Sequence, residues 1–124
     1  MNIRRGMTTA LVSGVIGAGL VVVAPTPAHA ATFDLIGSTS VHGRAVNLWR
    51  KTSEGPGLHG QIKGSPGDQV WLENTWYQVI GKYTIPNGAS EVNTSSIGTY
   101  GSKFRACGKA GNRPEVACTD FGKA

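Results

Sequence analysis

The sequence has no cluster of basic residues, no acidic residues at alternate positions and no set of cysteines and histidines spaced for a metal. Nucleic-acid binding requires cations gathered in a patch or stripe, and here they are scattered singly along the chain. A calcium loop requires several carboxylates close together. A zinc site requires four ligands, and no histidine lies near Cys107 and Cys118. We therefore expect no nucleic-acid partner, no metal and no cofactor.

Catalytic signatures are also missing. The chain contains no G-x-S-x-G, no H-E-x-x-H and no glycine-rich phosphate loop. We interpret His42 and His59 as surface residues, because neither lies in a recognisable catalytic context. The expectation is that the protein is not an enzyme. A weak hydrolase with Asp34 or Glu73 as the acid/base is retained as the third hypothesis for function.

Only one long apolar stretch occurs, and it lies near the N-terminus. Two arginines precede a 15-residue uncharged run from Ala10 to Ala24, and Ala28–Ala30 supplies the small-x-small pattern of a signal-peptidase site. These are the parts of a secretory signal peptide, and the run is short for a membrane span. We expect residues 1–30 to be removed and residues 31–124 to be secreted as a single small domain, monomeric and without membrane attachment.

Export bears on the state of Cys107 and Cys118, the two cysteines of the chain. Paired cysteines in an oxidising compartment usually form a disulfide, and the spacing of ten intervening residues differs from the C-x-x-C of redox pairs. The sequence therefore predicts a structural disulfide. Without the leader, ten basic and seven acidic residues give a net charge of +3, which permits weak attraction to an anionic cell wall.

Glycines interrupt short runs rich in Val, Ile, Trp, Tyr and Thr, and helical periodicity is almost absent. This pattern is typical of an all-β domain. We expect a small antiparallel sandwich or barrel-like domain of about seven to eight short strands. The predicted strands are Phe33–Ile36, Arg44–Arg50, Leu58–Lys63, Gln69–Glu73, Tyr77–Thr84, Glu91–Ile97, Lys103–Cys107 and Val116–Phe121.

Turn residues predict how some strands connect. Ser65-Pro66-Gly67-Asp68 has proline and glycine at the positions that a type II turn favours, so we expect it to join Leu58–Lys63 and Gln69–Glu73 as a hairpin. Pro86-Asn87-Gly88 predicts a second turn of the same kind. The last two predicted strands form a C-terminal hairpin, which the predicted disulfide closes.

Alternation along the strands suggests a binding face. If Val46, Leu48, Val70 and Leu72 face the core, Trp49 and Trp71 point away from it. Aromatic rings beside amides and carboxylates suit sugars, because the rings stack on the apolar side of a sugar and the polar groups bind its hydroxyls. The first hypothesis is therefore a binding module for cell-wall or environmental glycan, although outward tryptophans also serve ordinary packing. Its residues are Asn47, Trp49, Gln69, Trp71 and Glu73.

The second hypothesis is a small extracellular protease inhibitor or protein-interaction module. The segment 108–115 lies between the two cysteines, so a disulfide braces it, and a pre-ordered loop loses less entropy on binding. Arg113 is the obvious anchor for a protease cleft. Pro114, directly after it, does not suit a substrate-like fit to serine proteases.

The run AVNLWRKTSEGPGLHGQIKGSPGDQVWLEN, with the ending FRACG…VACTDF, resembles small secreted proteins of actinobacteria and other Gram-positive bacteria whose function is unknown. The resemblance covers about half of the expected mature chain and implies a secreted β domain without implying an activity. The positions that carry it are Val46, Leu48, Ile62, Pro66, Gly67, Asp68, Val70 and Trp71.

Overall fold

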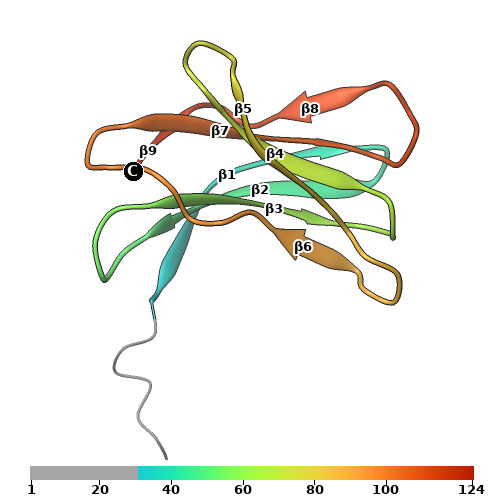
Figure 1. The fold of residues 1–124 in the computed structure, drawn as a ribbon, viewed down its shortest axis with the longest axis horizontal. Coiled ribbons are helices and arrows are strands. Elements are labelled where there is room, and N and C mark those ends of the chain that lie inside the picture. The colour runs from blue at the N-terminus through green and yellow to red at the C-terminus, as the bar shows by residue number, and fades with distance from the viewer. Residues whose placement is uncertain (1–30) are drawn as a thin grey trace, which may run out of the picture. The chain divides into compact units, whose positions relative to one another are not determined.

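Two antiparallel β-sheets face each other in the computed structural model, which describes residues 31–124 (Figure 1). The predicted signal peptide lies outside the described residues. Sheet A has the strand order β1-β2-β3-β6, and sheet B has the order β5-β4-β7-β8, with β9 also paired to β7. The strands are β1 (Phe33–Val41), β2 (Arg44–Lys51), β3 (Leu58–Lys63), β4 (Gln69–Asn74), β5 (Val79–Thr84), β6 (Glu91–Asn93), β7 (Lys103–Lys109), β8 (Val116–Cys118) and β9 (Gly122–Lys123).

This architecture confirms the predicted all-β sandwich, and the differences lie at strand ends. β1 continues to Val41 because a bulge between Leu35 and Gly37 shifts its register against β2 without ending the pairing. The predicted strand Glu91–Ile97 shortens to β6, followed by an isolated bridge between Leu58 and Ile97.

The turn Ser65–Asp68 forms as expected, but the predicted hairpin is wrong. The Asp68 N–H donates to the Ser65 carbonyl at 3.1 Å and Gly67 has φ +96°, yet β3 belongs to sheet A and β4 to sheet B. The turn therefore carries the chain from one sheet to the other. Pro86–Gly88 also precedes a change of sheet, from β5 to β6. Turn chemistry specifies a chain reversal and leaves the pairing partner of each strand open.

His42 and Gly43 form a turn that the sequence patterns did not indicate. Both residues have positive φ, +47° and +77°, and they join β1 to β2 with Val41 opposite Arg44. Such two-residue loops match the twist of paired strands. The usual signal for such a loop is asparagine or aspartate before glycine, and histidine stands in that position here, which explains why the hairpin was missed.

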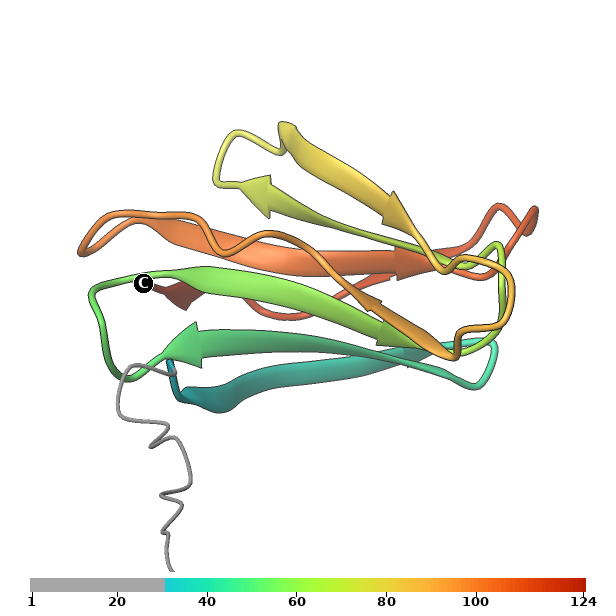
Figure 2. The same ribbon diagram turned by 60° about the horizontal axis from the view of Figure 1, so that its bottom comes forward.

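The two sheets lie one above the other (Figure 2). The buried core between them is aliphatic, and the partly buried Tyr83 and Phe104 pack against it. The predicted core residues Val46, Leu48, Val70 and Leu72 are all 1 % exposed or less. Gly108 lets β7 approach sheet A closely, because a Cβ at this position would lie 2.7 Å from Cγ2 of Val46. The layer between the sheets is thus too thin at this point for a large side chain.

Asp68 connects three segments at one edge of the sandwich. Its buried carboxylate, 1 % exposed, accepts hydrogen bonds from Arg44 Nε at 2.8 Å, from the Ser65 N–H at 2.7 Å and from the Gly111 backbone. Burial raises the pKa of Asp68, but these hydrogen bonds and the Arg44 charge outweigh it, so the pKa lies below its usual value. Gly64 has no side chain because a Cβ there would collide with this carboxylate.

The predicted disulfide between Cys107 and Cys118 is confirmed. The two residues are direct partners across β7 and β8, and their Cα atoms lie 4.0 Å apart. The cross-link holds β8, which has only three residues, against the longer β7.

Replacing Asp68 tests the buried connection. We expect Asp68→Asn to lower the free energy of unfolding by about 2 kcal/mol at pH 7, because a hydrogen-bonded charge is lost beside Arg44. The lowered pKa of Asp68 means that its contribution is present above the unfolded-state pKa of about 3.9 and disappears as pH falls through the folded-state value. Urea unfolding at pH 7 and pH 3 measures this, with the exposed Asp34→Asn as control. Equal losses at both pH values would contradict the assignment.

Removing the cross-link tests its share of stability. The double variant Cys107→Ala/Cys118→Ala should lose about 3 kcal/mol, because the unfolded chain regains the freedom of the closed loop. Urea unfolding of the disulfide-bonded protein and of the double variant measures the difference. A difference below about 1 kcal/mol would show that the disulfide is dispensable for the fold.

Candidate ligand-binding face

The predicted glycan-binding residues divide between two opposite faces of the sandwich. Asn47 and Trp49 lie on the outer side of sheet A, whereas Gln69, Trp71 and Glu73 lie on the outer side of sheet B. Both tryptophans are outside the aliphatic core, as alternation predicted. A single platform combining Trp49 with Trp71 is wrong, however, because the chain changes sheet between β3 and β4.

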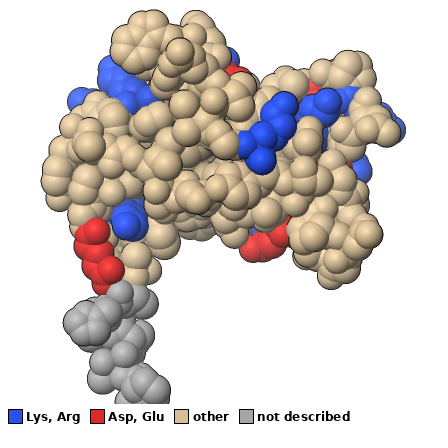
Figure 3. Space-filling model, in the orientation of Figure 1, with Lys and Arg blue, Asp and Glu red and all other residues tan. Residues whose placement is uncertain are grey.

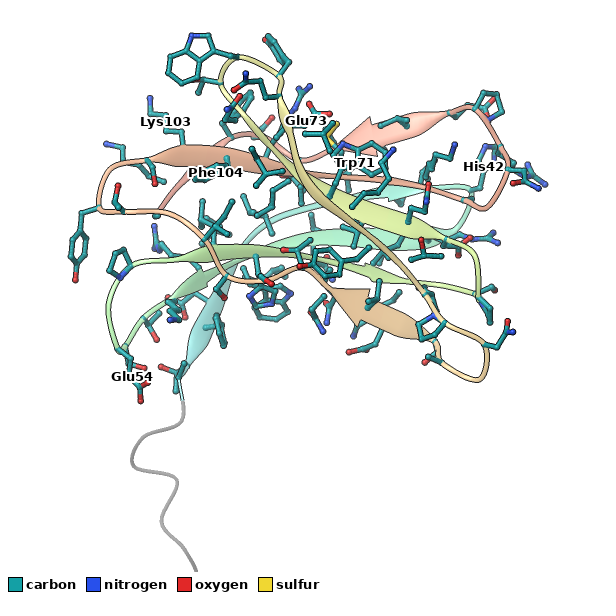
Figure 4. The ribbon with its side chains drawn as sticks, in the orientation of Figure 1. His42, Glu54, Trp71, Glu73, Lys103 and Phe104 are labelled. Carbon is teal, nitrogen blue, oxygen red and sulfur yellow. A yellow bond between two sulfur atoms is a disulfide. The ribbon has the colours of Figure 1, made fainter. Side chains whose placement is uncertain are left out.

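Trp71 is covered despite lying on an outer face. Its ring is only 4 % exposed, and the Lys82 ammonium group lies 4.6 Å from the ring centroid. The indole N–H donates to Glu73 Oε2 at 2.8 Å (Figure 4). Trp71 therefore has little free surface for stacking on a ligand.

Glu73, a candidate acid/base, is engaged by its neighbours. Besides Trp71, Arg105 donates to Glu73 Oε1 at 2.7 and 3.1 Å. Its guanidinium lies over the edge-to-face pair of Tyr77 and Phe121, 4.8 and 5.1 Å from their ring centroids. Burial raises the pKa of Glu73, but the hydrogen bond from Trp71 and the Arg105 contacts outweigh it and lower the pKa. A general acid requires the opposite shift. Asp34 lies exposed on the edge strand β1.

Trp49 belongs to an aromatic cluster that the sequence patterns did not predict. Its ring and that of its cross-strand partner His59 are nearly parallel, with an interplanar angle of 14° and centroids 6.4 Å apart. Phe33 meets His59 edge-on at 4.7 Å. The three half-buried rings border an open hollow of about 700 Å³, whose polar lining includes Asn93 and Ser96.

A row of polar side chains across sheet A fixes Trp49. Ser38 donates to Asn47 Oδ1 at 2.9 Å, Asn47 donates to Gln61 Oε1 at 3.0 Å, and Gln61 donates to Glu91 at 3.4 Å. The Trp49 indole N–H also donates to Gln61 Oε1, at 3.1 Å. Asn47 and Gln61 are each 8 % exposed, so Asn47 positions the ring and offers little surface to a ligand.

His59 gives the cluster a neutral centre. Burial lowers the pKa of His59, and a polar contact with the Asn93 side chain acts weakly in the opposite direction. The imidazole is therefore uncharged at neutral pH. Alternation in β3 contained the signal for this residue, since His59 and Gln61 flank the inward Gly60 in the sequence LHGQIK.

The predicted inhibitor loop lies against the β1–β2 turn. Arg113 is hydrogen-bonded to His42 Nδ1 at 3.1 Å, and the other ring nitrogen of His42 lies 2.8 Å from Glu115 Oε1. The Arg113 N–H donates to the Ala110 carbonyl at 2.9 Å. The loop is thus braced at its base by the disulfide and along its length by His42, and the Arg113 side chain is already engaged.

Comparison with protein-family models, with curated proteins and with solved structures finds no match to this chain. The resemblance of residues 45–74 to small secreted bacterial proteins stays a prediction. Over residues 31–124, no helix has the length and apolar character needed to cross a membrane.

The burial of His59 predicts a pH dependence. Because its pKa is lowered in the folded state, the unfolded chain binds the proton more readily, and stability rises with pH up to the unfolded value near 6.5. The midpoint temperature of thermal unfolding should therefore rise between pH 4.5 and pH 7.5, and it should rise less in His59→Gln. The same dependence of stability on pH in the variant would show that His59 does not cause the dependence.

Proposed function

We propose that this protein is a secreted glycan-binding module whose ligand contacts the outer face of sheet A around Trp49. The observation that carries the proposal is the cluster of Phe33, Trp49 and His59 beside an open hollow. Aromatic rings on a solvent-facing sheet accept the apolar side of a sugar ring. The exposed Asn93 and Ser96 border the same hollow and supply groups for sugar hydroxyls.

The proposed ligand is a neutral glycan. The middle of this face carries the neutral imidazole of His59 and uncharged amides, whereas Lys51 and Lys63 lie at the strand ends. Lys51 is the cross-strand partner of Phe33 but does not line the hollow, and an acidic sugar would find no cation among the residues that border it. A neutral sugar gives up hydrogen bonds with water when it binds, and the amides and hydroxyls of this face replace them.

Pre-organisation also favours binding. The Trp49 indole is held by Gln61, and Gln61 is held in turn by Asn47. A side chain that is fixed before the ligand arrives loses little rotamer entropy on binding. Trp76, by contrast, is 78 % exposed on the loop between β4 and β5.

Secretion is part of the same proposal. It rests on the leader-like N-terminal sequence, and the disulfide is compatible with an oxidising compartment. A glycan of the cell wall or of the surroundings is then the accessible ligand.

Replacing Trp49 tests the proposal directly. Retention on insoluble chitin or cellulose, both neutral polymers, should fall at least about ten-fold in Trp49→Ala, because the main stacking surface is lost. Trp76→Ala removes an equally large ring outside the hollow and should bind as the unmodified protein does. Lack of retention on both polymers, or equal loss in the two variants, would contradict the proposal.

The inhibitor loop is a second candidate, favoured by the bracing of residues 108–115 against Asp68 and His42. Inhibition assays with trypsin-, subtilisin- and papain-like proteases test it. The hypothesis predicts slowed substrate cleavage that Arg113→Ala relieves. Unchanged rates with every protease would reject it.

A further inference from the structure

The outer face of sheet B gathers basic residues that are dispersed in the sequence. In β7, Ala106 and Gly108 face the core, so Lys103, Arg105 and Lys109 point outward. Neighbouring strands add Lys82 and Lys123, and Glu73 is the carboxylate opposite Arg105. In Figure 3 the larger blue areas lie over this upper layer. We call these residues the basic face: Lys82, Lys103, Arg105, Lys109 and Lys123.

The cations of the basic face are only partly neutralised. Arg105 pairs with Glu73, and among the described residues Lys103, Lys109 and Lys123 take part in no ion pair. Lys103 and Lys123 are direct partners on neighbouring strands, an arrangement in which like charges repel. A bound anion would relieve this repulsion.

Exposed aromatic residues lie at one end of sheet B, where Tyr77 contacts Arg105 and Trp76 borders a hollow together with Lys103. Trp76 and Tyr77, 78 % and 65 % exposed, occupy the turn between β4 and β5. Asn74 holds this turn rigid, because its Oδ1 accepts from the N–H groups of Trp76 and Gln78 at 2.9 and 3.0 Å. The β4–β5 hairpin rises out of the layer of β7 (Figure 2), and Lys103 points to the same side (Figure 4).

We propose that the basic face binds a polyanionic glycan, a carboxylated or phosphorylated polysaccharide, whose chain runs along β7. Lys103 and Lys109 contact its anionic groups, and Trp76 stacks on a sugar ring at the hairpin end. Outward residues two apart in a strand are spaced by roughly 6.6 Å. Because Cys107 occupies the outward position between Arg105 and Lys109, the unpaired Lys103 and Lys109 lie roughly 20 Å apart along β7, a span that an extended polymer can cover. This site lies on the opposite sheet from Trp49 and does not depend on the proposed neutral-glycan site.

The geometry favours a polysaccharide over two other anionic partners. Single-stranded nucleic acid requires successive stacking platforms, but Trp71 and Phe121 are covered by Lys82 and Arg105. A flat bilayer resting on the raised hairpin would be held away from Lys109, which lies at the other end of β7. A flexible polysaccharide can follow the whole basic face.

Binding of heparin and polygalacturonate to the secreted protein tests the proposal, with neutral dextran as reference. Lys103→Gln/Lys109→Gln should weaken both affinities about ten-fold at 50 mM NaCl and reduce their dependence on salt. Lys51→Gln/Lys63→Gln removes the same charge from sheet A and should change the affinities less than about two-fold. Trp49→Ala should bind both polyanions normally, which separates this site from the neutral-glycan site.

Several outcomes would overturn the proposal. Equal losses in the two double-lysine variants would show that net charge alone attracts the polymer. Tighter binding to phosphatidylglycerol vesicles or to single-stranded DNA than to both polysaccharides would assign the face to a membrane or to nucleic acid. Absence of polyanion binding at 50 mM NaCl would also reject it. Unfolding curves of all variants check that each one is folded.

Discussion

The close approach of the two sheets determines where the tryptophans of β2 and β4 lie. Gly108 leaves no room for even a methyl group beside Val46, and Gly60 meets Ala106 and Val70 in the same layer. Such a thin interior accepts Val, Leu, Ile and Ala and has no place for an indole ring. Trp49 and Trp71 are consequently on outer surfaces, and the chemistry of the domain is displayed there rather than in an internal cavity.

The two outer surfaces have different chemistry although the same alternation produces both. Sheet A exposes neutral rings, one of which is held by a buried amide, whereas sheet B exposes cations that lie over rings. Asp68 and the disulfide stabilise the edges that support these surfaces, since one joins the sheet-changing turn to β2 and the other secures β8. A neutral glycan on one sheet and an acidic glycan on the other would let a single small domain bridge two polymers.

Alternation and turn chemistry predicted much of this structure from the sequence. They identified the aliphatic core, the strand positions and the covalent link between Cys107 and Cys118. They failed at Ser65–Asp68, because a proline–glycine turn has the same composition whether its strands pair or change sheets. That one error placed Trp71 beside Trp49. The basic face was missed for a related reason, because the charges of KFRACGK look scattered until every second residue is assigned to one side of the strand. The aromatic cluster depends on register between β1, β2 and β3, which local sequence does not specify.

The central claim is that Trp49, alone among the three tryptophans, contacts a neutral glycan. Each tryptophan gives a separate indole N–H resonance in a ¹⁵N-correlated NMR spectrum, so a titration with chitohexaose and cellohexaose reports on all three at once. The account predicts that at least one of these oligosaccharides shifts the Trp49 resonance and the backbone signals of β2 and β3, while those of Trp71 and Trp76 stay in place. Shifts confined to Trp71, to Trp76 or to residues 108–115, or no shifts with either sugar, would contradict it.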